Sequence, residues 1–226
     1  RQQKLYTASA LKLKEALAGG AWSGNGKLEV LSQLMRLRQI CCDPALCFED
    51  YTGESAKLET CVSLIASASA AGHKILLFSQ FASMLERIRE RLLQEGISSH
   101  LLVGATPKEE RSRMVQAFAS DEVPVFLISL KAGGTGLNLT AADIVIHYDP
   151  WWNVAAQNQA TDRAYRIGQE KPVTVYKLIL KDTIEENLLK LQNAKLALAA
   201  QVVSEGMVSL GDLSQNELME LFEQNL

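Results

Sequence analysis

The chain has 226 residues, of which 47% are hydrophobic and 22% are charged, and its formal net charge is −3. This length and composition fit one globular domain with appendages, or two small domains, with enough apolar residues to fill a core. The weak negative charge excludes the broad basic surface of a protein that coats nucleic acid, so any DNA contact would come from a local basic groove or be shared with another domain. No apolar run is long enough to span a bilayer and no secretory signal pattern is present, so we expect an intracellular protein with no membrane partner.

The four cysteines are clustered, but neither a regular disulfide framework nor a paired histidine accompanies them. They are Cys41, Cys42, Cys47 and Cys61, and the three scattered histidines are His73, His100 and His147. This pattern favours buried free thiols in a reducing cytosol over zinc ligands or disulfides. The sequence therefore predicts no metal site at these residues.

Two helices are predicted at the start, over residues 5–18 and 27–42, because leucines recur in both at helical spacing. A glycine-containing stretch at residues 19–26 separates them, and Asp43-Pro44 ends the second. Residues 1–54 are therefore predicted to form a helical lead-in.

From residue 55 on, apolar runs of strand length alternate with segments of helical period. Strands are predicted at residues 75–78, 98–103, 125–129, 144–148 and 173–180, and helices at residues 57–71, 81–94, 106–119, 153–165 and 183–203. Continuous apolar strands separated by helices indicate a parallel sheet with helices on both faces. The fold class is thus α/β, with a three-layer domain over residues 55–182 and C-terminal helices with an acidic tail over residues 183–226. Thr106 to Glu109 has the pattern of a capping box at a helix start.

Small and hydroxyl-bearing residues follow four of the predicted strands. The four loops begin Ser79-Gln80-Phe81, Gly104-Ala105-Thr106, Lys131 to Asn138, and Asp149 to Asn153. The carboxyl ends of parallel strands share one edge of a sheet, where ligands bind, and free backbone N–H groups there favour phosphate. Each loop alone is ordinary turn chemistry, but together they predict a phosphate-binding edge.

The segment QATDRAYRIGQ (159–169) carries two arginines three residues apart, Arg163 and Arg166, next to Asp162. On a helix this spacing places both guanidinium groups on one face. Such fork-shaped, always-charged donors suit a polyphosphate whose negative charge grows in a transition state. The alternative is a solvated surface helix with an Asp–Arg pair.

The phosphate-binding loop that a nucleotide hydrolase needs is missing from the sequence. Residues 24–27 read Gly-Asn-Gly-Lys, but Ala21 and Leu28 stand where a Walker A motif needs Gly and Ser or Thr. Asp121-Glu122 follows no apolar strand and is not a Walker B motif, and the GGTG run lacks dinucleotide-binding spacing. The chain has arginines suited to a triphosphate without the loop that would hold one.

A series of motifs resembles one known family. In chain order the motifs are RLRQICCDP, KILLFSQF, GATPKEERSRMVQAF, SLKAGGTGLNLTAADIVIHYDPWWN and QATDRAYRIGQ. They resemble the second RecA-like lobe of a Swi/Snf-type ATPase, a DNA-translocating motor of helicase superfamily two. The resemblance runs from about Gln2 to Leu191 and implies a RecA-like fold, with protruding helices within residues 1–54. One departure is Asp43-Pro44, where the family often has His-Pro.

The resemblance implies roles for particular residues. Arg163 and Arg166 would be catalytic arginine fingers, and the residues on the ATP side would be Gln159, Asp162, Gly134 and Gly136. The residues at the DNA backbone would be Ser79, Gln80, Thr106 and Lys131. Trp152 would also lie at the DNA, although core packing is an equal alternative for both Trp151 and Trp152. Asn138 is expected to be a turn or cap residue.

The implied whole is a DNA-dependent ATPase that moves along double-stranded DNA. ATP and Mg²⁺ would be bound mainly by the first lobe, so this chain alone would be inactive. Its partners would be duplex DNA, the first RecA-like lobe and, as a candidate substrate, a DNA-bound protein. The compact lobe favours a prokaryotic cytoplasm or nucleoid, with the nucleus as the eukaryotic equivalent. A strand-separating helicase and a non-enzymatic DNA- or protein-binding module remain as alternatives.

Overall fold

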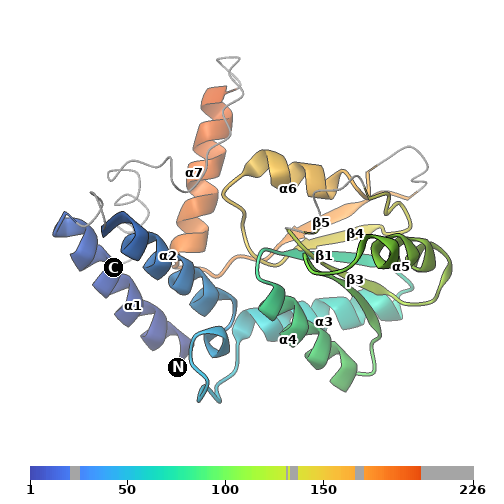
Figure 1. Ribbon diagram of the computed structural model, residues 1–226, viewed down its shortest axis with the longest axis horizontal. Coiled ribbons are helices and arrows are strands. Elements are labelled where there is room, and N and C mark those ends of the chain that lie inside the picture. The colour runs from blue at the N-terminus through green and yellow to red at the C-terminus, as the bar shows by residue number, and fades with distance from the viewer. Residues whose placement is uncertain (21–25, 131, 133–136, 166–170, 200–226) are drawn as a thin grey trace. The chain divides into compact units, whose positions relative to one another are not determined.

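The computed structural model describes residues 1–20, 26–130, 132, 137–165 and 171–199 (Figure 1). It contains two compact units. The helical unit comprises Arg1–Lys57, Trp152–Val154 and the described residues from Ile179 on, and the sheet unit comprises Leu58–Trp151 and Ala155–Leu178. Each unit has a hydrophobic core of its own.

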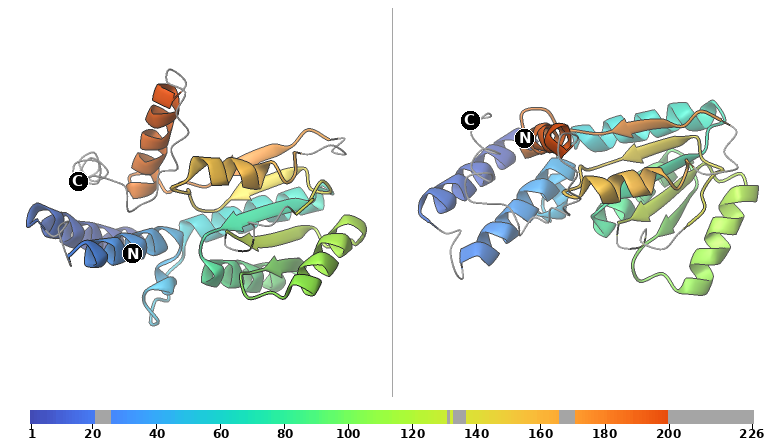
Figure 2. Two further views of the ribbon diagram at one scale, coloured as in Figure 1. Left: turned by 45° about the horizontal axis from the view of Figure 1, so that its top comes forward. Right: turned by 90° about the horizontal axis from the view of Figure 1, so that it is seen from above.

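The helical unit is built on α1 (Gln2–Ala18) and α2 (Gly26–Cys42), which lie side by side (Figures 1 and 2). Their buried residues recur every three or four positions, because each helix buries one face. These residues are Tyr6, Ala10, Leu13 and Leu17 in α1 and Val30, Leu34, Leu37 and Ile40 in α2. Helix α7 (Ile184–Ala199) joins the same core through Ile184, whose N–H donates to Tyr6 Oη at 2.6 Å.

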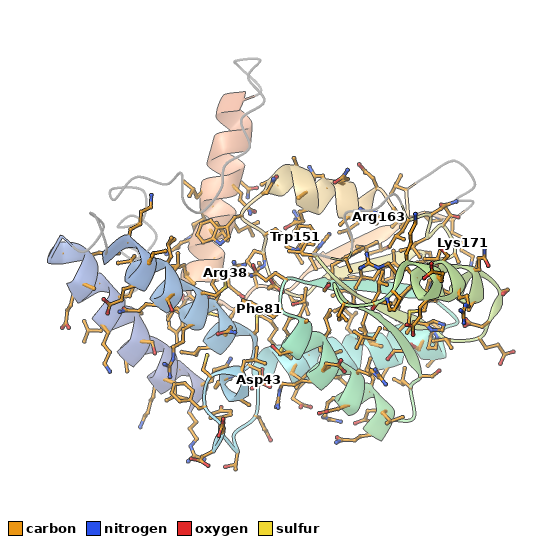
Figure 3. All side chains as sticks on the ribbon, in the orientation of Figure 1. Arg38, Asp43, Phe81, Trp151, Arg163 and Lys171 are labelled. Atoms are coloured by element: carbon orange, nitrogen blue, oxygen red, sulfur yellow. The ribbon has the colours of Figure 1, made fainter. Side chains whose placement is uncertain are left out.

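A short 3-10 helix, η1 (Pro44–Leu46), follows α2. Its cap is Asp43, labelled in Figure 3, whose Oδ1 accepts a hydrogen bond from the Ala45 N–H at 2.9 Å. Pro44 occupies the first helical position, where a missing N–H costs nothing. The position that often holds histidine in the family therefore holds a capping residue here.

The start of α3 (Ala56–Ala70) carries a buried ion pair within the helical unit. Lys57 Nζ contacts Glu185 Oε2, and the two residues are 4% and 1% exposed. The same carboxylate oxygen accepts the Leu180 N–H at 2.9 Å. Burial alone would lower the pKa of Lys57, but the Glu185 charge, the neighbouring Cys42 and Cys41, and the hydrogen bond to Glu185 together outweigh it and raise that pKa.

The sheet unit contains five parallel strands in the order β2-β3-β1-β4-β5. The strands are β1 (Ile75–Ser79), β2 (Ser99–Leu102), β3 (Val125–Ser129), β4 (Ile144–His147) and β5 (Thr174–Lys177). Every residue of the central strand β1 is buried, and the same is true of its neighbours β3 and β4. The predicted parallel α/β fold is confirmed.

Helices cover both faces of this sheet, which gives three layers. On one face, alternate residues of the central strands pack against α5 (Lys108–Ser120) and α6 (Val154–Thr161). These strand residues are Leu76, Phe78, Phe126, Ile128 and Val145. In Figure 1, α3 and α4 (Ala82–Gln94) lie on the opposite side of the strands from α6.

Strand β5 differs from the prediction. The expected apolar strand over residues 173–180 is shortened to Thr174–Lys177, and all four of its residues are exposed. It lies at the edge of the sheet, where β4 is its one pairing partner among the described strands. An apolar run therefore did not indicate burial at this position.

The remaining expectations concern cysteines and the C-terminal region. The four cysteines are free; Cys41, Cys42 and Cys61 are buried, and Cys47 is half-buried. Among the described residues, no group of three His, Cys, Asp or Glu side chains could hold a metal ion, and no helix is long and apolar enough to cross a membrane. The predicted acidic tail at residues 204–226 lies outside the described part of the chain.

Candidate functional site

The carboxyl ends of the strands lie along one edge of the sheet because all five strands are parallel. Short backbone hydrogen bonds extend the strand ladders into the loops that follow. The Tyr148 N–H donates to the Phe78 carbonyl at 2.9 Å, and the Leu130 N–H donates to the Ser79 carbonyl at 3.0 Å. The loops after β1, β3 and β4 therefore start from fixed positions at this edge.

Asp149 links the loop after β4 to the loop after β1. Its Oδ1 accepts the Ser79 hydroxyl at 2.5 Å and the Gln80 N–H at 3.3 Å. The Ser79 hydroxyl in turn accepts the Phe81 N–H at 3.1 Å. Ser79 is fully buried and its hydroxyl is occupied within the protein, whereas Gln80 is half-buried at the edge. Sequence reasoning did not single out Asp149, although an acid directly after a buried strand was the available signal.

The loop after β2 does not contain the predicted capping box. Helix α5 begins at Lys108 with Pro107 as its N-cap, and no side chain caps it. The Thr106 side chain instead bonds to the preceding loop, where its Oγ1 accepts the Val103 N–H at 3.1 Å. The interpretation of Thr106 to Glu109 as a capping box is wrong, since Thr106 stands one position before the cap.

Arg111 holds the loop after β2 in place. It was not identified as a site residue from the sequence. Its Nε donates to the Thr106 carbonyl at 2.8 Å, and its Nη2 donates to the Gly104 carbonyl at 2.8 Å. Its Nη1 reaches the Ala132 carbonyl after β3 at 3.5 Å. One planar guanidinium group thus ties together the loops after two neighbouring strands, β2 and β3.

The helix before Arg163 is shorter than predicted. Helix α6 ends at Thr161, and residues 162–164 form a turn in which the Asp162 N–H donates to the Asn158 carbonyl at 2.8 Å. The helix predicted over residues 153–165 is therefore wrong at its C-terminal end. The helix face predicted for both arginines is not seen at Arg163, which lies beyond the end of α6, and Arg166 lies outside the described residues.

Arg163 is fixed from both sides of its backbone. Its N–H donates to the Ala160 carbonyl at 3.2 Å, and its carbonyl accepts the Leu139 N–H at 3.2 Å. The neighbouring Ala160 and Ala164 are buried in the core of the sheet unit. Arg163 itself is 3% exposed (Figure 3). Gln159 and Asp162, by contrast, are exposed.

Trp151 and Trp152 belong to different units. Trp151 is buried in the sheet unit, with its ring edge-on to Phe78 at 6.2 Å and to His147 at 5.6 Å. Trp152 is half-buried and packs against the core of the helical unit, where the Arg38 guanidinium lies 5.5 Å from its ring centre. The structure thus gives Trp152 a packing role, and its DNA contact stays a prediction.

Four predicted site residues lie outside the described residues: Lys131, Gly134, Gly136 and Arg166. Of the described ones, Ser79 ends β1, Gln80 and Thr106 lie in the loops after β1 and β2, and Gln159, Asp162 and Arg163 lie in or just after α6. Asn138 is exposed in the loop before β4. A parallel five-stranded sheet with helices on both faces is the architecture of a RecA-like lobe.

Comparisons with known proteins support the assignment of a RecA-like lobe. Residues 56–168 match the protein family described as "Helicase conserved C-terminal domain". The chain is 39% identical over 230 residues to "Uncharacterized ATP-dependent helicase MG018" of Mycoplasma genitalium, covering 98% of this chain and 21% of the relative. It is 34% identical over 237 residues to "SWI/SNF-related matrix-associated actin-dependent regulator of chromatin subfamily A member 1" of mouse, covering 97% of this chain and 22% of the relative. The chain thus spans about a fifth of the length of such curated relatives.

Two solved structures from Sulfolobus solfataricus are also similar. One is the SWI2/SNF2 ATPase core in complex with dsDNA, with a TM-score of 0.80 and 34% identity over 98% of this chain and 47% of that chain. The other is the SWI2/SNF2 ATPase C-terminal domain, with a TM-score of 0.78 and 31% identity over 100% of this chain and 94% of that chain. The chain belongs to the helicase conserved C-terminal domain family, as the C-terminal lobe of a Snf2-type ATPase of helicase superfamily two.

Proposed function

We propose that this chain is the C-terminal motor lobe of an ATP-dependent double-stranded DNA translocase. The observation that carries the proposal is the anchoring of Arg163 directly after α6, where backbone hydrogen bonds hold it on both sides. An always-charged guanidinium on a fixed backbone is suited to stabilise charge that develops on a transferring phosphoryl group. Arg163 and Arg166 would act in this way on ATP held by the first lobe.

The nucleotide itself would be held mainly by the first lobe. The sequence has no Walker A loop, and no group of acidic or histidine side chains in the described ranges could hold Mg²⁺. The residues of this chain on the nucleotide side would be Gln159, Asp162, Gly134 and Gly136. Gln159, in α6, and Asp162, just after it, are exposed and so are accessible to another lobe, which supports this role. Arg163 is 3% exposed in this lobe, so its guanidinium would have to turn outward to reach ATP.

The DNA side would be formed by the loops after β1, β2 and β3. The Thr106 hydroxyl accepts the Val103 N–H and keeps its own proton to donate to a phosphate oxygen. Gln80 and Lys131 would reach the same strand, while the buried Ser79 would act by holding its loop against Asp149. Such contacts position a protein on the backbone without reading bases. Trp152 would contact the DNA through the exposed part of its ring, and a DNA-bound protein is the proposed load.

The test uses the two-lobe protein and duplex DNA. Arg163→Ala and Arg166→Ala should each lower kcat for ATP by about 10³- to 10⁵-fold, the range found for arginine fingers, with much less effect on nucleotide affinity. Arg→Lys should rescue only in part, because a point charge cannot replace the planar fork. The 226-residue chain alone should not hydrolyse ATP.

Near-normal turnover in both alanine variants would show that the arginines are structural. Triplex displacement without strand separation is expected from the two-lobe protein. Efficient unwinding of a plain duplex would favour a strand-separating helicase instead.

A further inference from the structure

The end of α6 is pinned to β4 through the Thr161 side chain. Thr161 Oγ1 lies 2.9 Å from His147 Nε2 and 3.2 Å from the Gln157 carbonyl oxygen. His147 is the last residue of β4 and is 1% exposed. These contacts join a central strand of the sheet to the last turn of the helix that precedes Arg163.

The protons of this contact can be assigned from its chemistry. The Thr161 hydroxyl has one proton, and its bond to the Gln157 carbonyl uses it. His147 Nε2 must then carry the hydrogen that Thr161 Oγ1 accepts. His147 Nδ1 is buried without a hydrogen-bond partner in the described part of the chain, and a bare nitrogen is tolerated there better than an N–H. Burial, with a smaller effect from Lys177, lowers the pKa of His147 to about 4, so the ring is neutral.

The histidine end of this contact is rigid. The His147 ring stacks on Phe78 with ring centres 5.6 Å apart and an angle of 22° between their planes. Trp151 meets the same ring edge-on at 5.6 Å and 89°. His147 and Phe78 are also direct neighbours in the pairing of β4 with β1. The ring cannot turn without disturbing the core of the sheet unit.

Thr161, on the helix side of this contact, lies two residues before Arg163 in the chain. The chain leaves helical geometry at Thr161, two residues before Arg163. The Arg163 N–H bonds back to Ala160, which lies on the same last turn. A shift of that turn would therefore move the backbone from which the guanidinium projects.

We propose that His147 and Thr161 are positioning residues that fix the last turn of α6 and thereby direct Arg163. This inference rests on the proposed role of Arg163 as an arginine finger. Neither residue touches the nucleotide, and both act through the backbone of the turn. A displacement of about 1 Å at a reacting centre can cost about 100-fold in rate, so a hydrogen bond remote from ATP can matter for turnover.

The kinetic test compares paired variants of the two-lobe protein. His147→Phe and Thr161→Val remove the hydrogen bond while keeping side-chain bulk, and each should lower kcat by roughly 10- to 100-fold with little change in the KM for ATP. His147→Gln keeps a donor near the Nε2 position and Thr161→Ser keeps the hydroxyl, so both should retain most of the activity. The His147→Phe, Thr161→Val double variant should be no slower than the slower single variant, because one contact is lost in each.

The matched control is His100→Phe. His100 lies in β2, contacts Phe126 edge-on at 5.6 Å and bonds Asp121 Oδ2 at 2.7 Å through Nε2, and among the described residues it has no hydrogen bond or ring contact with α6. The same substitution there should leave kcat unchanged. An equal loss of kcat in His100→Phe would show that the effect of His147→Phe is general destabilisation and would overturn the inference.

A second measurement does not depend on activity. Nitrogen NMR of the 226-residue chain should show His147 as the neutral tautomer with hydrogen on Nε2, and Thr161→Val should shift the Nε2 signal. A ring protonated on Nδ1 would overturn the assignment. In the two-lobe protein, if Arg163→Ala abolishes turnover while His147→Phe and Thr161→Val keep it, only this inference fails. If Arg163→Ala keeps turnover, the proposed function fails and this inference fails with it.

Discussion

Truncating Trp152 separates its packing role from its proposed DNA contact. The ring packs on the core of the helical unit and lies 5.5 Å from the Arg38 guanidinium. Removal of a fully buried large aromatic costs about 3–5 kcal/mol, and Trp152 is only half-buried, so we expect about 2–3 kcal/mol from packing. Loss of the cation–π contact adds about 0.5–2 kcal/mol. The indole Nε1 is buried without a partner among the described residues, and removing it offsets part of this cost.

The expected net loss for Trp152→Ala is therefore about 3 kcal/mol. At about 2–4 °C per kcal/mol for a chain of this size, the melting temperature of the 226-residue chain should fall by roughly 6–12 °C. Thermal unfolding followed by circular dichroism measures this directly. An unchanged melting temperature would refute the packing argument and leave the ring free for another role.

The matched variant Trp152→Phe keeps an aromatic ring against Arg38 and should lose much less stability. In the two-lobe protein it provides the functional readout, because its fold is retained. Base–aromatic contacts contribute about 1–3 kcal/mol per base, and a smaller ring should weaken such a contact. Normal ATPase with reduced triplex displacement would support the DNA contact. Normal values for both activities would show that Trp152 serves packing alone.

Two further predictions concern stability. Lys57→Met should lower the free energy of unfolding by about 3–5 kcal/mol, because the buried Glu185 carboxylate loses its partner. Adding Glu185→Leu to this variant should recover most of the loss. Denaturant unfolding of the wild type, the single variant and the double variant would measure both effects. Burial would raise the pKa of Asp121, but hydrogen bonds from His100 and Lys74 outweigh it and lower that pKa. The ionised Asp121 therefore adds to the stability of the fold above about pH 4, and this added stability is lost as the pH falls further. Asp121→Asn should therefore flatten the acid limb of the stability–pH curve, and a limb identical to that of the wild type would contradict this assignment.

The sequence alone determined the fold class and most of the elements. Strands β1, β3 and β4 were predicted within one residue at either end, because a strand buried on both faces must be a continuous apolar run. The prediction that α1 and α2 form a helical region before the sheet also followed from periodicity. The motif series led to the correct family, which the match over residues 56–168 confirms.

Only the tertiary structure decided how the site is supported. Periodicity cannot say which strands are neighbours, so the pairing of β1 with both β3 and β4 was not available from the sequence. Without it, nothing indicated that Asp149 would meet Ser79, seventy residues earlier in the chain. The exposure of β5 likewise was not available from its apolar sequence, because burial depends on which elements cover a strand in the folded chain.

The same reason explains the errors at helix ends. Local patterns for Thr106 and for the residues after Thr161 predicted a capping box and a longer helix, and both predictions were wrong. The Thr106 hydroxyl bonds the Val103 N–H, while Thr161 bonds His147 on β4. Helix ends have unpaired backbone groups that can be satisfied in several ways, so nearby partners, which come together only in the folded chain, decide where a helix stops.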